Sequence, residues 1–399
     1  MKRLNPALIA TTFFWIGSLT NQVDGIEATT NPVGVIQISA PGNSDTLVSL
    51  PLIHPAVFNG IVGSYSGSEV TVSGSPGWTE DAWAGDHYVF GRSGSWEGHY
   101  ATISGNTADT LTLDIEADTL AQIAAGDRLS IHPYWTLGTL FPGGEGVNAA
   151  TSHVTRDTEI LFQDPNAIGI NQAADSIYYY LAGEWKKVGG DLNGDYSDTI
   201  IVPDGFFIVR HNTGTATTIT FTGEVIMGKI ALPLLYQDIS EQDNIIGLQR
   251  PIEMTLDESG LGTNLGSGGA LYVWDQTVSQ MNRMIANADK YTFDGTARRK
   301  NDGTDDVGSE EVFLPGVGFV IRQAMAADVN ERSWINEPNY GNKWSNPPRA
   351  NSSINPPVPN LFDLQFMENF LRENRFLFLF WGLLPFSPNP CLGQLHNFG

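Results

Sequence analysis

The chain has 399 residues, of which 41% are apolar, so it can build two or three packed domains and is not a disordered protein. Its 21 basic and 44 acidic residues give a formal charge of −23, which excludes functions that depend on neutralising nucleic-acid phosphates or anionic lipids. The single cysteine, Cys391, excludes a disulfide framework or a cysteine-based zinc site within one chain. The low charged fraction of 16%, with many Gly, Ser, Thr and Asn, is typical of secreted β-proteins.

The first residues resemble a signal peptide. Lys2 and Arg3 precede an apolar run from Ala7 to Leu19, which matches the charged start and apolar centre of such a segment. We therefore expect residues 1–28 to be a signal peptide and the protein to be exported to the periplasm, the cell surface or the medium. A short buried segment is the alternative. The run is too short for a comfortable membrane span.

From Val33 the pattern changes to strands. Val35–Ile38 alternates, Asn43–Asp45 is a turn, and Thr46–Leu50 is a second strand, so we expect a hairpin. Asp243–Leu248 repeats the pattern of its second strand at an offset of 198 residues. The opening segment of the chain therefore has a partner much later in the sequence.

A second repeat begins at Tyr178. At an offset of 112 residues and without a gap, Tyr178–Arg210 matches the stretch ending at Arg322. Matching residues in the two stretches are Tyr179 and Tyr291, Gly183 and Gly295, Lys186 and Arg298, Pro203 and Pro315, Phe207 and Phe319, and Arg210 and Arg322. We expect an all-β chain of two tandem, related, β-sandwich-like units, covering residues 29–226 and 227–341.

The two offsets differ by 86 residues, so the first unit must contain additional sequence. Residues 66–133 read as about five short strands, with one helix over Asp118–Ala124. This pattern predicts a small β-barrel of SH3-like or OB-like shape, inserted into the first unit.

The repeated stretch itself reads as scaffold. Tyr178–Leu181 and Phe206–Val209 have the composition of adjacent core strands, and Gly183 suits a hairpin turn. Arg210 and Arg322 fall at strand ends, where a guanidinium can bond loop carbonyls or a neighbouring carboxylate. A pair of matching ligand sites is the alternative.

An acidic loop inside the repeat has oxygen donors at alternating positions. It resembles the start of an EF-hand-type calcium loop, in which alternate carboxylates and amides surround a hard cation. It lacks the glycine after the third donor, where Tyr196 stands, and the twelfth-position acid, where Val202 stands. A solvated hairpin loop is one interpretation and structural calcium is the other. The candidate calcium ligands are Asp191, Asn193, Asp195, Ser197 and Asp198.

Aromatic residues cluster in the insert beside acidic residues. Aromatic faces on a β-surface stack on sugars while carboxylates bond their hydroxyls, so a carbohydrate site is one interpretation and the core of a small barrel is the other. The candidate ligand-binding residues are Trp78, Trp83, Tyr88, Trp96 and Glu97.

Catalytic motifs are absent from the sequence. The seven histidines show no zinc-binding spacing, and no Gly-x-Ser-x-Gly elbow, phosphate-binding loop or dinucleotide fingerprint occurs. Residues 342–399 form a Pro/Asn-rich linker and an apolar tail. An interfacial anchor, an export or sorting tail, and sequence from a shifted reading frame all fit this tail.

Several strings resemble a group of secreted, β-rich bacterial proteins. The most specific are Tyr134–Gly138, which reads Tyr-Trp-Thr-Leu-Gly, and the Tyr-rich stretch Tyr178–Gly189, which ends Trp-Lys-Lys-Val-Gly. The similarity covers residues 31–340, and the tail departs from it. The resemblance implies export and a duplicated β-architecture, and it brings no activity or catalytic residues with it.

Together these features favour a secreted or cell-surface protein that is not an enzyme and has a structural or adhesive role. The first alternative is an extracellular glycan-binding module that uses Trp78, Trp83 and Trp96. The second is an extracellular hydrolase with its site between the units. We expect polysaccharide or other envelope components as partners and no nucleic acid, and the sequence does not set the oligomeric state.

Overall fold

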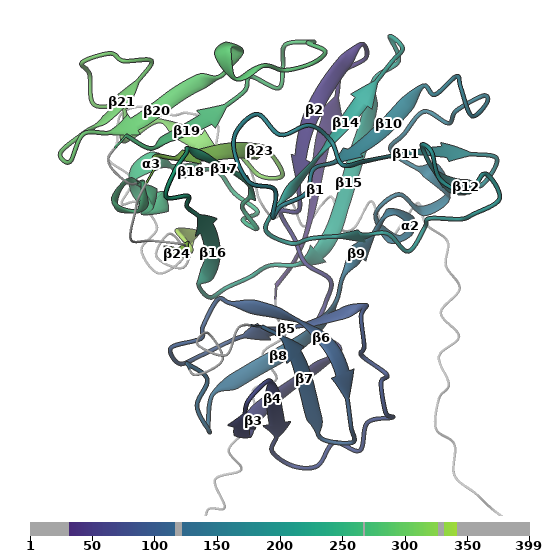
Figure 1. Ribbon diagram of the computed structural model, residues 1–399, viewed down its shortest axis with the longest axis vertical. Helices are drawn as coiled ribbons and strands as arrows, with labels where there is room; N and C mark the ends of the chain where they lie inside the picture. Colours follow the sequence, from purple (N-terminus) through teal and green to yellow (C-terminus); the bar gives the residue numbers. More distant parts are fainter. Residues whose placement is uncertain (1–31, 116–121, 266–267, 326–330, 341–399) are drawn as a thin grey trace, which may run out of the picture. The chain divides into compact units, whose positions relative to one another are not determined.

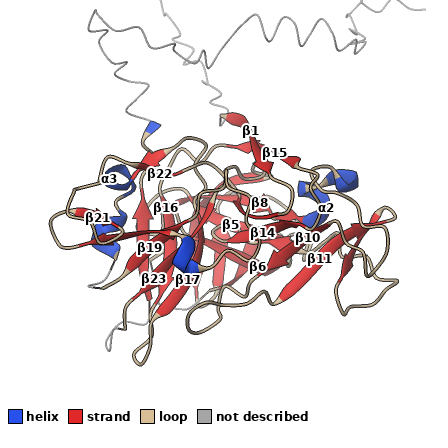
Figure 2. Cartoon of the chain, turned by 90° about the horizontal axis from the view of Figure 1, so that it is seen from above, coloured by secondary structure: helices blue, strands red, loops and turns tan. Residues whose placement is uncertain are grey.

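The computed structural model describes residues 32–115, 122–265, 268–325 and 331–340. Strands and loops make up nearly all of this part of the chain, and its helices are single turns (Figure 2). The all-β prediction is confirmed. The expected signal peptide and the tail lie outside the described residues, as does most of the expected helix at Asp118–Ala124. No helix among the described residues is long and apolar enough to cross a membrane.

The first unit is built around a five-stranded sheet of order β12-β11-β10-β14-β2 (Figure 1). The strands β1 and β15 form a second, two-stranded sheet, and β9 and β13 form a third. In chain order the elements are β1 (Val33–Ala40), β2 (Ser44–Ser49), β9 (Trp135–Thr136), α2 (Leu137–Leu140), η1 (Pro142–Gly144), β10 (Thr158–Phe162), β11 (Ser176–Leu181), β12 (Glu184–Lys187), β13 (Ile200–Ile201), β14 (Phe206–His211) and β15 (Thr217–Glu224).

The second unit repeats this topology. Its five-stranded sheet has the order β21-β20-β19-β23-β17, and the pairs β16–β24 and β18–β22 form the smaller sheets. The prediction of two related units is therefore confirmed. The elements are β16 (Ile230–Leu235), β17 (Gln242–Gly247), β18 (Met254–Thr255), α3 (Leu256–Ser259), η2 (Leu261–Asn264), β19 (Ala270–Val273), η3 (Ile285–Asn287), β20 (Asp289–Phe293), β21 (Arg298–Lys300), β22 (Glu311–Phe313), β23 (Gly318–Gln323) and β24 (Glu331–Asn336).

A closed barrel lies between β2 and β9 in the chain, as the sequence predicts, with the strand order β3-β4-β7-β6-β5-β8. It begins at Phe58 rather than at Ser66, because β3 belongs to the barrel and closes it against β8. Its own core includes Val62, Ile103 and Leu129. The strands are β3 (Phe58–Ser66), β4 (Glu69–Val72), β5 (His87–Gly91), β6 (Tyr100–Asn106), β7 (Thr110–Asp114) and β8 (Arg128–Pro133).

Two predicted strand pairings are wrong. The strands β1 and β2 do not pair with each other, because β1 pairs with β15 and β2 with β14. The turn between them bonds instead to the turn between β14 and β15, through the amide of Asn43 and the carbonyl of Thr213 at 2.7 Å. The second error concerns β11 and β14, which are not adjacent because β10 lies between them.

The hairpin turn predicted at Gly183 is present. Leu181 pairs with Glu184 across a two-residue turn, and Ala182 and Gly183 have φ values of 54° and 97°. Two positive φ values in succession are the geometry of a type I′ turn, in which glycine is favoured. Gly295 in the second unit also has a positive φ, 96°, but its loop between β20 and β21 is longer, since Phe293 pairs with Arg298.

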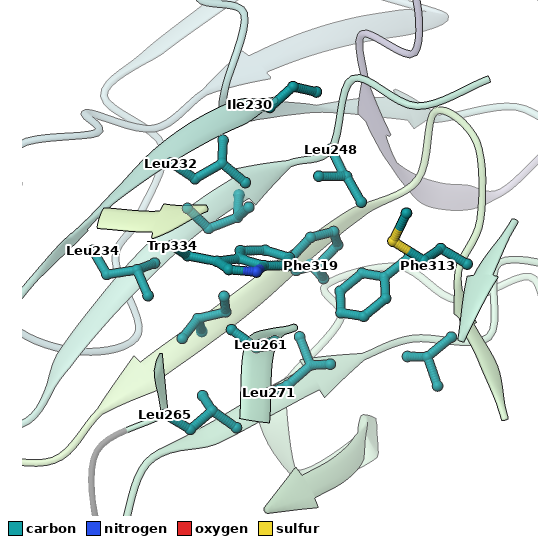
Figure 3. Packing of buried hydrophobic residues seen from close by; sticks show 14 of the residues in the cluster. Ile230, Leu232, Leu234, Leu248, Leu261, Leu265, Leu271, Phe313, Phe319 and Trp334 are labelled. Carbon is teal, nitrogen blue, oxygen red and sulfur yellow. The ribbon is translucent and has the colours of Figure 1, made fainter. Parts of the chain in front are cut away.

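The core of the second unit is centred on Trp334. Figure 3 shows this ring among leucine side chains, with Phe319 beside it. Its Nε1 donates to the carbonyl of Ser259 at 2.8 Å, so the one polar atom of the buried indole is satisfied. The same cluster includes Tyr88 and Phe90 of the barrel, so barrel and unit share part of their core.

His132 makes the stability of the barrel depend on pH. It is fully buried, bonded to the carbonyl of His54 and the hydroxyl of Ser130, and burial lowers its pKa to about 4. An unfolded histidine titrates near 6.5, so between these values the unfolded chain binds a proton that the folded barrel does not. We expect the free energy of unfolding to fall by about 2–3 kcal/mol as the pH is lowered from 6.5 to 4.

Urea unfolding of the parent and of a His132→Gln variant at pH 7 and pH 4.5 checks this. The variant should lose less stability on acidification than the parent. Equal losses in the two proteins would contradict the assignment to His132.

Candidate functional site

Two buried carboxylate–arginine pairs occupy equivalent places in the two units. In the first unit Arg210 on β14 lies opposite Asp45 on β2. Its Nε donates to Oδ1 and its Nη2 to Oδ2, each at 2.7 Å. In the second unit Arg322 on β23 donates to Asp243 on β17 in the same way, at 2.7 and 2.9 Å. The expectation that these arginines bond a neighbouring carboxylate is confirmed.

Each pair is completed by a loop from the other unit. The amide of Asn282, in the β19–β20 loop, donates to Asp45 at 2.8 Å, and its side-chain oxygen accepts from Arg210 at 2.9 Å. Reciprocally, Asn171 in the β10–β11 loop donates to Asp243 at 2.7 Å and accepts from Arg322 at 3.1 Å. Asn282 and Asn171 have φ values of 51° and 55°, a left-handed backbone that asparagine tolerates better than most residues. The loops are therefore exchanged between the units.

A second reciprocal contact lies at the opposite ends of the same strands. The amide of Ser49, at the end of β2, donates to the carbonyl of Gly316 at 2.9 Å. The amide of Gly247, at the end of β17, donates to the carbonyl of Asp204 at 2.7 Å. The two sheets are thus fastened to each other at both ends of β2 and β17.

A groove of about 550 Å³ lies between these fastenings. Its base is an apolar cluster of Leu47, Phe206, Trp274 and Val320, which come from both units. The exchanged loops form its rim and contribute Asn171, Asn282 and Met284, among others. Asp45, Arg210 and Asp243 also line it.

The carboxylates that line the groove are held in ion pairs. Its described lining contains no histidine, cysteine, serine, lysine or tyrosine, and its carboxylates, Asp45 and Asp243, are each held by an arginine. The bond to Asp243 raises the pKa of Arg322, as expected for a guanidinium held by a carboxylate. Neither carboxylate is therefore free to act as a general acid or base.

The structure separates the predicted aromatic cluster of the barrel. Tyr88 and Trp96 are core residues with exposed fractions of 2% and 3%. Trp78 and Trp83 are half-buried on the barrel surface, with ring centroids 6.2 Å apart in an edge-to-face contact. Glu97 lines a different pocket, beside Gly228. Only Trp78 and Trp83 are thus brought together as a surface pair.

The acidic loop at Asp191–Asp198 uses its oxygens within the loop. One carboxylate oxygen of Asp195 accepts from the amides of Trp185 and Ser197 and from the Ser197 hydroxyl, and the hydroxyl bond lowers the pKa of Asp195. Asp191 accepts from the amide of Asn193, and Asp198 is exposed. Within the described residues no group of three or more His, Cys, Asp or Glu could hold a metal ion. Structural calcium stays a prediction from sequence without geometric support.

A third junction joins the barrel to the first unit. The phenol of Tyr100 donates to Oδ1 of Asp204 at 2.8 Å beside a pocket of about 410 Å³. Burial raises the pKa of Asp204. Asp204 is the carboxyl group between parts of the fold that the hydrolase alternative would use. Because Asp204 is bonded to the barrel and its carbonyl to β17, a role in holding these parts together accounts for it.

No family model, curated protein or solved structure matches this chain, so the resemblance to secreted β-rich bacterial proteins stays a prediction from sequence.

The buried carboxylate–arginine pairs should be essential for stability. Replacing Arg322 by Leu leaves the carboxylate of Asp243 buried without its counter-ion, and we expect a loss of about 3–5 kcal/mol in the free energy of unfolding. Arg210→Leu should be destabilising for the same reason, but less so, since its side chain is more exposed. Urea unfolding measures both.

The matched control is Lys290→Leu, which removes an exposed ion pair with Asp302. Here we expect a loss below about 1 kcal/mol. A loss for Arg322→Leu no larger than that of the control would contradict the role assigned to the buried pair.

Proposed function

We propose that the protein is a non-enzymatic adhesive protein, exported from the cell, which holds a protein component of the envelope through the groove between its two units. The observation that carries this proposal is the use of the charged side chains in the groove. They join the two units, and the base that they surround is apolar. A site of this kind gains free energy by burying apolar surface.

The exchanged loops also carry exposed apolar side chains, of which Met284 lines the groove. Ile168 and Ile170 lie beside Asn171 on one loop, with exposed fractions of 70% and 40%. Val278 and Met284 lie on the other loop, at 53% and 63%. Exposed apolar side chains on loops that border a groove are characteristic of protein interaction sites.

A protein partner fits this groove better than a polysaccharide. The hydroxyls of a sugar need unpaired donors and acceptors, and the charged side chains of Asp45, Arg210 and Asp243 in the groove already have ion-pair partners. Apolar side chains of a protein would need no such partners. The acidic, hydroxyl-rich composition and the N-terminal segment support export.

Blocking the groove should release the protein from the envelope. Ala286 lies on η3 at the groove and is exposed, so Ala286→Trp fills the groove without disturbing a core. We expect the variant to bind about tenfold or more weakly, as for a blocked interface centre, and to move from the envelope to the soluble fraction of the source cells. Immunoblots of the two fractions measure this.

Leu192→Trp is the control, because Leu192 is exposed on the acidic loop and lies outside the groove lining. It should fractionate like the parent protein. The proposal fails if the parent protein is soluble, or if Ala286→Trp stays with the envelope while its melting temperature is unchanged.

A second candidate function is glycan binding by the barrel. Trp78 and Trp83 keep part of their rings exposed next to Glu80, Asp81 and Asp86, which are exposed as well. Aromatic faces beside carboxylates are a common surface for sugars. This observation favours the pair Trp78–Trp83 over the original cluster, because buried Trp96 cannot reach a ligand.

Trp83→Ala tests this candidate by retention in a polysaccharide affinity gel. We expect a loss of about 1–3 kcal/mol per stacking ring, or roughly five- to hundredfold in affinity, if the ring is a platform. Trp96→Ala is unsuitable as a test, because emptying a core site lowers stability. Unchanged migration of Trp83→Ala through every gel would sink this candidate.

A further inference from the structure

Two arginines lie side by side on the outer face of the barrel. Ile61 on β3 pairs with Arg128 on β8, and the amide of Arg92, just after β5, donates to the carbonyl of Arg128 at 2.8 Å. Side chains alternate across a barrel wall, and Arg128 and Ile61 are exposed while Leu129 and Val62 are buried inside. In a chain with a charge of −23, two adjacent guanidinium groups are a local exception.

The charges of these arginines are incompletely neutralised. Within the described residues the side chain of Arg128 makes no ion pair or hydrogen bond. Arg92 has one acid nearby, with its Nη2 3.6 Å from Glu224, and its buried Nη1 has no partner. Every other described arginine whose side chain is placed bonds a carboxylate or several carbonyls. A bound anion would therefore supply the counter-charge that these two arginines lack.

The two arginines line a pocket of about 630 Å³. Asn59 on β3 and Glu97 in the β5–β6 loop also line it, and neither side chain has a hydrogen-bond partner among the described residues. Met227 and Gly228, in the link to the second unit, are on its other side. Ile61 and Met227 are 49% and 42% exposed, so the pocket also offers apolar surface.

We propose that this pocket binds a hydroxylated carboxylate, namely an acidic sugar such as a hexuronate. The carboxylate lies against Arg128 and Arg92, because a guanidinium bonds a carboxylate through two parallel hydrogen bonds. The hydroxyls bond Asn59 and Glu97, which supply donors and acceptors. The apolar face of the sugar ring lies on Ile61 and Met227.

The other ligand classes match the pocket less well. A sulfate ion has no hydroxyls for Glu97 and no apolar face for Ile61 and Met227. A neutral sugar would leave the two arginines without a counter-ion, and a simple carboxylate would leave Asn59 and Glu97 without partners. The overall negative charge repels anions only over about 8 Å at physiological salt.

The pocket shares no lining residue with the groove between the units. Sugar binding at this pocket is therefore independent of what the groove binds. It extends the second candidate function by moving sugar recognition on the barrel from the tryptophan pair to the arginine pair. Glu97 is the one residue of the original prediction that belongs to it.

Calorimetric titration of the full chain with glucuronate, glucose and acetate at 0.15 M salt tests the ligand class. We expect glucuronate to bind in the range of about 0.1–1 mM, which is ordinary for a single sugar. Glucose and acetate should each bind about tenfold or more weakly. Absence of glucuronate binding up to about 10 mM would overturn the proposal, and so would binding of acetate or glucose with equal affinity.

Variants of Arg128 test whether the sugar binds in this pocket. Arg128→Ala should weaken glucuronate binding about tenfold or more, and Arg128→Lys should be intermediate, because lysine keeps the charge and loses the paired donors. Arg128 is exposed and unpaired, so its variants should keep the parent melting temperature. Lys290→Ala removes a positive charge in the second unit and should leave the affinity unchanged.

Trp83→Ala separates the two barrel surfaces. It should leave glucuronate binding unchanged if the sugar lies at the arginines. Loss of binding in Trp83→Ala with none in Arg128→Ala would overturn the proposal and place the sugar at the tryptophan pair. Loss of envelope association in Ala286→Trp concerns the groove alone.

Discussion

The arrangement of the two units depends on a carboxylate that is shared between them. Asp45 lies on β2 of the first unit, where it holds Arg210 of its own sheet and the Asn282 amide of the other unit. Asp243 does the same in reverse with Arg322 and Asn171. A buried carboxylate is tolerated only when its oxygens accept enough hydrogen bonds. Removing either exchanged loop would take away one of these bonds and leave the buried charge less well compensated. Each unit therefore supplies a hydrogen bond to the buried carboxylate of the other.

This arrangement explains why the groove has an apolar base. The exchanged loops and the end contacts of β2 and β17 join the two sheets on either side of the groove, and apolar side chains of both units lie between these contacts. Leu47, Phe206, Trp274 and Val320 fill part of this space and the rest stays open as the groove. Two well-bonded ion pairs and an apolar surface thus lie next to each other.

Much of the fold could be predicted from the sequence, because repeated patterns report on equivalent environments. The offsets of 198 and 112 identified Asp45 with Asp243 and Arg210 with Arg322, and the register pairs these residues. The pairing of β1 with β15 could not be predicted, since alternation in a strand shows which face is buried and not which strand lies beside it. The sequences around Asn171 and Asn282 are too different to be recognised as a repeat, although the two loops make equivalent contacts.

The candidate sites were less predictable for a related reason. A tryptophan in a barrel core and a tryptophan on a ligand-binding surface have the same sequence context. Trp96 and Trp83 therefore differ only in their exposure, which the structure gives. Arg128 gave no signal at all, because a functional arginine differs from a structural one only in lacking a partner. The duplicated parts of the chain use their charges to join the two units. The barrel uses Tyr100 and Arg92 to contact the first unit, whereas Asn59, Glu97 and Arg128 have no side-chain partner among the described residues and line a pocket where a ligand could supply one.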